Sequence, residues 1–317
     1  MTAAKKSKKA EQQAGQKADA PRELRLVKEA KIQDLIGDAA GTRLEASGVL
    51  YRDGAFLVVC DNLTSFIRIS SELSPKAPEN GVLTPKGQKK TGSSKEVEGY
   101  EDLAHDELRD HCFTLSEAVP VKPKGFRGRV QEYDAKLRPC GSSWLDFTLT
   151  DANKGMEGLE WVERSGTGYL LGLCEGNRCA GGKEGQRPGG GRIQVFRHGG
   201  KQWDHEATIR LPAALPFEDY SSVSVREDGR IAVLSQASSA LWVGRLSTKK
   251  WQVDEGTVYR LPTDSKGRTV YGNPEGVSWV SADHVVVVSD RAKKGAAGER
   301  VRAKDQSIHL FLIPGAS

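Results

Sequence analysis

One sequence pattern recurs five times along this chain. Each copy has a small or acidic residue two positions before an aliphatic residue, then a polar or glycine-containing stretch, and then an apolar run that ends in Ser or Cys and a polar residue. The aliphatic positions step by 54, 56, 64 and 54 residues, and they are Val49, Leu103, Leu159, Val223 and Val277. A period of this length accommodates one four-stranded sheet per unit, so the pattern predicts a tandem β repeat.

The apolar runs are short, rich in β-branched residues and bounded by turn sequences, which is typical of strands. The clearest runs cover residues 55–60, 168–174, 231–235 and 284–289, and second runs follow at 65–69, 192–196, 240–246 and 307–313. Helical periodicity of comparable strength is absent. We therefore predict an all-β fold, a five-bladed β-propeller. Six blades are the alternative, if residues 122–149 contain a degenerate unit.

The last repeat ends the chain on its third strand, so its sheet needs an outer strand from elsewhere. The segment from Leu24 to Ile32 alternates like a strand and lies at the other terminus. Closing the ring with this N-terminal strand would remove the exposed edges of an open array. We expect residues 22–317 to form a single β-propeller domain.

Residues 1–21 are basic and contain almost no large apolar side chain, so we expect a disordered basic tail. Much of the net charge of +5 comes from this tail, which leaves the rest of the chain close to neutral. A nucleic-acid partner is therefore not expected. Apolar runs of membrane-spanning length are absent, and the first twenty residues lack the apolar stretch of a secretory signal. These features predict no membrane association and a cytoplasmic location.

The five cysteines are odd in number and form no CxxC pair, which argues against a zinc site of that type. Cys60 and Cys174 end apolar strands, where a small buried side chain is the simplest interpretation. A bridge from Cys174 to Cys179 across four residues is compatible with the spacing, and the sequence leaves it open.

Three segments resemble known propeller families. Residues 153–159, Asn-Lys-Gly-Met-Glu-Gly-Leu, with the strand ending at Glu175, resemble a block of the phytase-like family called "esterase-like activity of phytase" and of the SdiA-regulated propellers. Residues 99–103 are similar to the preceding blade of those families, and residues 273–277 resemble a block of gluconolactonase-like propellers. The resemblance implies a propeller hydrolase. Asp102 departs from the pattern by replacing a glycine, and Ser47 and Ser221 stand where glutamate is expected.

The innermost strands of a propeller line its channel, so equivalent repeat positions should face one another there. Glu101, Glu157 and Glu275 would then converge, and their mutual repulsion would raise their pKa values unless a cation is bound. Hard oxygen ligands of this kind, completed by Ser47 and Ser221 or by backbone carbonyls, favour Ca²⁺ first and Mg²⁺ second. The alternative is that these glutamates accept hydrogen bonds from backbone amides of the next blade.

A second acidic set follows the second strand of each repeat. We predict that Asp61, Glu117 and Glu175 contact the substrate as catalytic residues, and Asp290 occupies the same repeat position. Carboxylates in such positions also stabilise turns, which is the alternative.

Two functions remain open at this stage. The first is a metal-dependent hydrolase of the phytase-like or lactonase-like type, acting on an ester or phosphoester at the mouth of the channel. The second is a non-catalytic propeller that binds a small ligand or a protein above a structural ion. A histidine or lysine recurring beside the carboxylates would favour catalysis, and the repeats show none.

Overall fold

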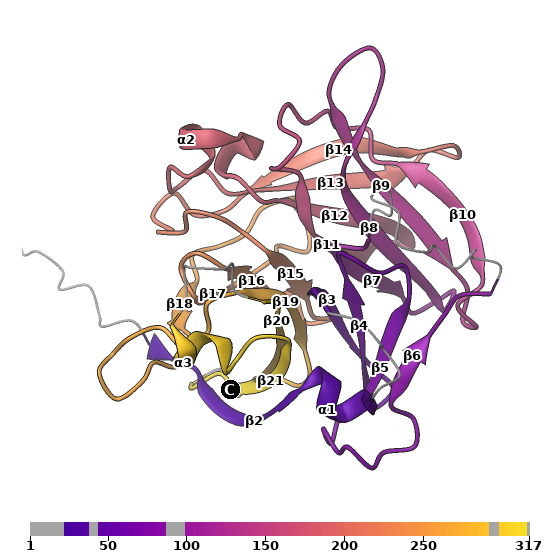
Figure 1. Ribbon diagram of the computed structural model, residues 1–317. Helices are drawn as coiled ribbons and strands as arrows, with labels where there is room; N and C mark the ends of the chain where they lie inside the picture. The colour runs from indigo at the N-terminus through magenta and orange to yellow at the C-terminus, as the bar shows by residue number, and fades with distance from the viewer. Residues whose placement is uncertain (1–21, 38–43, 87–98, 292–297, 316–317) are drawn as a thin grey trace, which may run out of the picture.

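The molecule is built from β-sheets whose apolar strands are buried on both faces. The computed structural model describes residues 22–37, 44–86, 99–291 and 298–315. Five sheets surround a central channel, and Figure 1 shows the innermost strand of each sheet nearest the centre. The fold is a five-bladed β-propeller, as the repeats predict. Residues 122–149 do not form a sixth blade, because they supply the two outer strands of the second sheet.

The blades follow one another along the chain. Blade 1 comprises β3 (Ala46–Arg52), β4 (Ala55–Cys60), β5 (Phe66–Ser70) and β6 (Gly81–Leu83). Blade 2 comprises β7 (Asp102–Asp106), β8 (His111–Pro120), β9 (Phe126–Tyr133) and β10 (Pro139–Trp144). Blade 3 comprises β11 (Met156–Arg164), β12 (Thr167–Cys174), β13 (Arg192–His198) and β14 (Trp203–Arg210).

The last two blades take strands from both ends of the chain. Blade 4 comprises β15 (Ser222–Val225), β16 (Arg230–Ser235), β17 (Ala240–Arg245), β18 (Thr257–Arg260) and β1 (Arg22–Glu23). Blade 5 comprises β19 (Pro274–Trp279), β20 (His284–Ser289), β21 (Ser307–Leu312) and β2 (Arg25–Lys31). The described helices are short: α1 (Ile32–Ile36), η2 (Asn177–Cys179), α2 (Gly182–Gly185) and α3 (Glu299–Arg302).

The hydrophobic core is divided among the five interfaces between neighbouring blades. Each blade packs against two neighbours, so both faces of its second strand are buried. All six residues of β4, Ala-Phe-Leu-Val-Val-Cys, are buried for this reason. This explains why the apolar runs are continuous and do not alternate with polar residues.

The N-terminal segment closes the ring. Strand β2 pairs antiparallel with β21, so the predicted closing strand is confirmed. His309 on β21 lies between Glu29 on β2 and Ser289 on β20, with its ring nitrogens 3.0 Å and 3.1 Å from their oxygens. This order of groups is that of a hydrolase triad, but Ser289 and His309 are 2% and 0% exposed. The network therefore ties three strands together and is closed to substrate.

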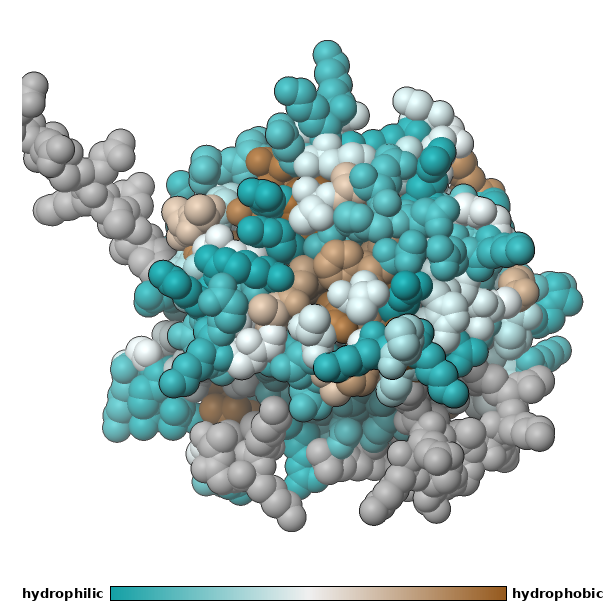
Figure 2. Space-filling model, turned by 90° about the horizontal axis from the view of Figure 1, so that it is seen from above, coloured by the Kyte–Doolittle hydropathy of each residue, from teal (hydrophilic) through white to brown (hydrophobic). Residues whose placement is uncertain are grey.

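The exterior is polar. The face shown in Figure 2 is mostly hydrophilic, with small apolar patches. Val27 and Leu108 are the large hydrophobic side chains that are exposed in the described part of the chain. The described helices include none that is both long and apolar enough to cross a membrane. The predicted basic tail, residues 1–21, lies outside the described residues.

Candidate functional site

The residue two positions before the aliphatic repeat position lies at the start of the inner strand in every blade, and in three blades it occupies a β-bulge. In β11, Met156 pairs with Cys174 and Gly158 pairs with Leu173, which leaves Glu157 as the extra residue. A bulge of this kind re-aims the side chain of the extra residue away from the regular alternation of the sheet. The carboxyl group of Glu157 consequently faces the channel.

The other blades repeat this geometry. The same register shift isolates Ser47 in β3 and Glu275 in β19. In blades 2 and 4 the amides of Glu101 and Ser221 donate to carbonyls of the second strand, at 2.8 Å and 3.0 Å. We call these five positions the bulge ring: Ser47, Glu101, Glu157, Ser221 and Glu275. They are the five residues that the repeat alignment places together.

The bulge ring lines a cavity of about 540 Å³ at one end of the channel, which we call the acidic cavity. Each inner strand starts here and each second strand ends here, because the two are antiparallel. The carboxyl groups that line the cavity are Glu45, Asp61, Glu101, Glu117, Glu157, Glu175, Asp219, Glu275 and Asp290. Lys154 supplies the one basic side chain among the described lining residues. All eight candidate residues from the sequence therefore lie along one cavity.

Several lining residues were not identified from the sequence. Glu45, Asp219 and Asn273 lie two positions before bulge-ring residues, and Gln236 directly follows its second strand as Glu175 follows β12. The repeat alignment contained this signal. Lys154 comes from the loop before β11 and has no counterpart in the other repeats, so only the folded structure reveals it.

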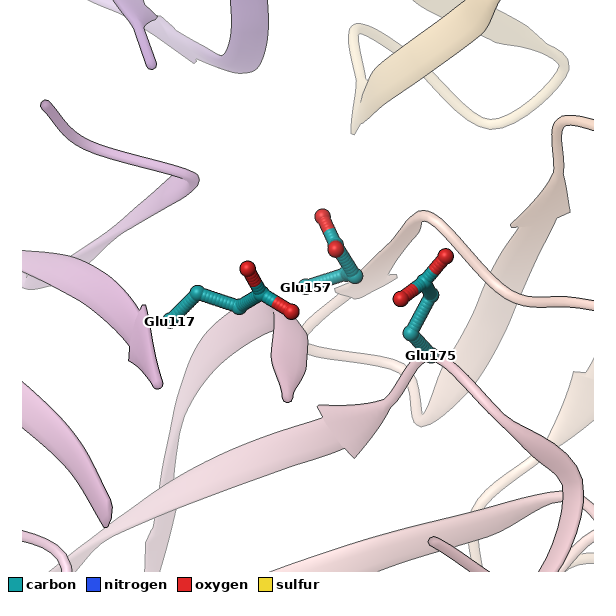
Figure 3. Close-up of side chains that lie close together, drawn as sticks. All are labelled: Glu117, Glu157 and Glu175. Carbon is teal, nitrogen blue, oxygen red and sulfur yellow. The ribbon is translucent and has the colours of Figure 1, made fainter. Parts of the chain in front are cut away.

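Three carboxyl groups form the tightest cluster. One oxygen each of Glu117, Glu157 and Glu175 can be chosen so that all three lie within 4.8 Å of one another. Figure 3 shows the three side chains converging from β8, from β11 and from the residue after β12. From the sequence, we predicted Glu157 to be a metal ligand and Glu117 and Glu175 to be catalytic residues. The geometry places them in one group.

Burial and mutual repulsion raise the pKa values of these acids. Burial, then the nearby carboxylates, raises the pKa of Glu101, Glu157 and Glu275 well above the ordinary value. Burial also raises the pKa of Glu117 to about 7, although the Gly155 amide opposes it. A cation that neutralises this charge would restore the ionised forms.

Several side chains hold the acids in place. Glu275 accepts hydrogen bonds from the side-chain amides of Gln236 and Asn273 at 2.6 Å and 3.0 Å. Glu117 accepts from the Gly155 amide at 2.6 Å. A Cβ on Gly155 would lie 2.5 Å from a Glu117 side-chain carbon, so this position requires glycine. These contacts orient the carboxyl groups toward the cavity.

Lys154 forms a hydrogen bond and ion pair with Glu175. Burial lowers the pKa of Lys154, but the hydrogen bond to Glu175 and the negative charges of Glu175, Glu157 and Asp219 together outweigh it, so the net shift of the pKa is upward. The lysine therefore stays charged, and it compensates one of the nine carboxylates.

The bulge-ring serines have backbone partners. Ser47 donates to the carbonyl of Tyr100, and Ser221 donates to the carbonyl of Pro274 at 3.1 Å. Each hydroxyl thus links its blade to a neighbouring one. Both residues also line the acidic cavity.

The contacts of Asp102 explain why an aspartate replaces the glycine of the repeat pattern at this position. It is 1% exposed, and it accepts hydrogen bonds from the Leu103 amide at 2.9 Å, the Leu159 amide at 3.0 Å and the Ser222 hydroxyl at 2.9 Å. A Cβ on Gly48 of β3 would lie 2.6 Å from its carboxyl oxygen. The Asp102 carboxyl therefore fills the channel beneath the bulge ring.

Two other acids make hydrogen bonds between blades of the kind considered for the glutamates. Asp102 links inner strands of different blades, and so does Glu160, which accepts from the Trp161 and Val225 amides at 2.8 Å and 2.7 Å. The bulge-ring glutamates line the acidic cavity, where Glu275 accepts from side chains of Gln236 and Asn273.

A disulfide lies beside the acidic cavity. Cys174 and Cys179 are bonded, so the bridge left open by the sequence is present, and the peptide after Cys174 carries Glu175. Asn177, fully buried between them, donates to the carbonyls of Gly185 and Phe217. The disulfide and Asn177 together hold the loop that positions Glu175. Disulfides persist mainly in oxidising compartments, and the cytoplasmic location stays an untested prediction.

Solved structures similar to this chain are β-propellers, and enzymes are among them. The glutaminyl cyclase of Myxococcus xanthus is 10% identical, with a TM-score of 0.54, over 92% of this chain and 97% of that chain. The PQQ-bound aldose sugar dehydrogenase of Streptomyces coelicolor is 11% identical, with a TM-score of 0.46, over 90% and 98% of the two chains. Virginiamycin B lyase of Staphylococcus aureus is 12% identical, with a TM-score of 0.38, over 92% and 75%.

At these identities the similarity shows the fold alone. No protein-family model and no curated protein sequence matches the chain. The resemblance to phytase-like propellers therefore remains a hypothesis based on the repeat motifs. The similarity to the glutaminyl cyclase, at a TM-score of 0.54, supports the coarser statement that this chain is a β-propeller.

Proposed function

We propose that the acidic cavity binds a divalent cation, Ca²⁺ first and Mg²⁺ second, and that the protein is a cation-dependent hydrolase of an ester or phosphoester. The observation that carries the proposal is the excess of nine carboxyl groups over one lysine in a single cavity. Burying so many like charges without a counter-ion is costly.

The donor set fits this class of cation. The lining groups offer carboxylate, hydroxyl and amide oxygens, and the described lining residues include neither histidine nor cysteine. Oxygen ligands suit Ca²⁺ and Mg²⁺, whereas zinc sites use nitrogen and sulfur ligands more often. Glu117, Glu157 and Glu175 would hold the ion. When bound, a cation of this class polarises a carbonyl or phosphoryl oxygen.

The remaining groups would act on the substrate. The Lys154 ammonium, held by Glu175, is placed to bind a negatively charged oxygen of a phosphoester. The side-chain amides of Gln236 and Asn273 keep Glu275 oriented. Asp61 lies along the same cavity outside the three-carboxylate cluster, and we assign it the role of accepting a proton from the attacking water.

The second candidate is a non-catalytic propeller that binds a small ligand above a structural cation. The observation that favours it is that the described lining residues lack histidine, the side chain that most often transfers protons near neutral pH. Ion binding is common to both candidates, and hydrolysis separates them.

The test uses protein stripped of metal with a chelator. Calcium and magnesium binding is measured by titration calorimetry, and chromogenic esters and phosphoesters are screened with and without the ion. Glu117→Gln should abolish both ion binding and hydrolysis. Glu160→Gln is the control, because Glu160 lies in blade 3 outside the acidic cavity and accepts hydrogen bonds from the Trp161 and Val225 amides. Ion binding without hydrolysis would favour the second candidate, and absence of ion binding would refute both.

A further inference from the structure

A second cavity, of about 450 Å³, lies between blades 1 and 2. It is lined by the turn that joins β3 to β4, by β5 and β6, and by residues 135–137 of the turn that joins β9 to β10. Strand β3 starts at the acidic cavity with Ser47 and ends at the second cavity with Arg52. The two cavities therefore lie at opposite ends of the blade.

The charge of this cavity is opposite to that of the acidic cavity, and we call it the basic cavity. Its described lining contains Arg52, Arg68, Lys86 and Lys136 against one acid, Asp53. Thr84 and leucine, valine and alanine side chains form the rest of the wall. A pocket that combines cationic groups with an apolar wall suits an anion that carries a hydrophobic body.

Arg52 is already paired. Its guanidinium forms ion pairs with Asp53, at 2.9 Å, and with Asp110 of blade 2. The one acid of the lining is therefore neutralised by one of the four cations. The excess positive charge belongs to Arg68, Lys86 and Lys136.

Arg68 is the central observation. It lies on β5, between Leu57 of β4 and Gly81 of β6 in the register of the sheet. Its Nε atom is buried, and the guanidinium has no hydrogen-bond or ion-pair partner in the described part of the chain. A buried donor without an acceptor is costly, and native structures rarely tolerate one without a reason.

A comparison within the same protein shows that this is unusual. Arg127 in blade 2 also has a buried Nε without a partner, but its guanidinium forms an ion pair with Asp146 at 3.0 Å. Arg68 has no such acid. A Cβ built on its neighbour Gly81 would meet nothing within 4 Å, so the space beside Arg68 stays open.

We propose that the basic cavity binds a small amphiphilic anion. Its oxyanion head, a carboxylate or a phosphate, pairs with the Arg68 guanidinium, whose planar fork matches both groups. Lys136 adds positive charge at the rim, and the aliphatic body packs on Leu57, Leu83 and Leu137. The volume lies in the range of small-molecule sites. This site is independent of the function proposed for the acidic cavity.

The probes are octanoate and octyl phosphate, measured by titration calorimetry and by thermal unfolding of the full chain. We expect at least one of them to bind and to raise the unfolding temperature. Acetate and inorganic phosphate, which lack the aliphatic body, and octanamide, which lacks the charge, should bind at least tenfold more weakly. Failure of both amphiphilic probes to bind would overturn the proposal. Equal binding by octanamide would also overturn it, because binding would then not depend on a charge that pairs with Arg68.

Arg68→Met separates the ligand role from a structural role. We expect the variant to bind the amphiphilic probe at least tenfold more weakly, and to unfold without ligand at the same temperature as the wild type or higher, because it removes an unpaired buried donor. Arg127→Met, the matched control, should lower the unfolding temperature and leave probe binding unchanged. A fall in unfolding temperature for ligand-free Arg68→Met, or unchanged probe binding, would refute the proposal.

Discussion

Replacing Glu157 with glutamine is the most direct perturbation of the acidic cavity. Glutamine keeps the size of the side chain and removes its charge. Because the oxygens of Glu117, Glu157 and Glu175 lie within 4.8 Å of one another, two ionised carboxylates repel each other by about 3.5 kcal/mol at an effective dielectric constant of roughly 20. The wild-type cluster therefore cannot ionise fully without a cation.

The variant should be stabilised by calcium much less than the wild type. In chelator, we expect the unfolding free energy of Glu157→Gln to equal or exceed that of the wild type by up to about 3 kcal/mol, since repulsion is relieved. Calcium at 100 times its dissociation constant stabilises the wild type by about 2.7 kcal/mol. If the variant binds the ion 100-fold more weakly, the same calcium concentration stabilises it by only about 0.4 kcal/mol.

Chemical denaturation followed by tryptophan fluorescence measures these differences. The experiment compares the wild type, Glu157→Gln and the control Glu160→Gln, each with chelator and with calcium. The control should keep the calcium response of the wild type. If Glu157→Gln keeps the full stabilisation by calcium, the cation hypothesis is wrong, and the cavity holds a network of hydrogen-bonded, protonated glutamates.

Three further perturbations test contacts that hold the five blades together. Asp102→Ala should lower the unfolding free energy by about 3 kcal/mol or more, since it leaves the buried Leu159 amide and Ser222 hydroxyl without their acceptor; an unchanged denaturation midpoint would contradict this. Deleting residues 1–20 should leave the melting temperature nearly unchanged, whereas deletion through Ile32 removes β1 and β2 and should lower it strongly. The His309 hydrogen bond, with help from Lys304, lowers the pKa of Glu29 to about 2. The ionised Glu29 carboxylate therefore adds to the unfolding free energy above its ordinary pKa, and this contribution is lost as the pH falls through about 2. We expect the unfolding free energy to fall by about 1–2 kcal/mol over this pH range, a value that already allows for solvent screening. The unfolding free energy of Glu29→Gln should lack this dependence on pH.

The repeat pattern predicted much of the fold because the relevant properties are local to the chain. A strand buried on both faces needs a continuous apolar run, as in β4, and such runs mark the blades in the sequence. The missing outer strand of blade 5 followed from counting strands. Equivalent positions in equivalent blades must face the same channel, which places Glu101, Glu157 and Glu275 along one cavity before any coordinates are known.

The grouping of Glu157 with Glu117 and Glu175 depended on the tertiary structure. The distance between side chains of different blades is set by how the blades pack and by the bulge that turns Glu157 toward the channel. In the sequence, Asp102 is only a departure from the glycine of the repeat. Its role depends on hydrogen-bond donors from other blades, which only the folded structure brings around it. Arg68 carries no sequence signal, because an unpaired donor is a property of its neighbours in space. Sequence by itself determined which residues are equivalent, whereas packing decided which of them meet, because contact distances depend on the placement of several blades at once.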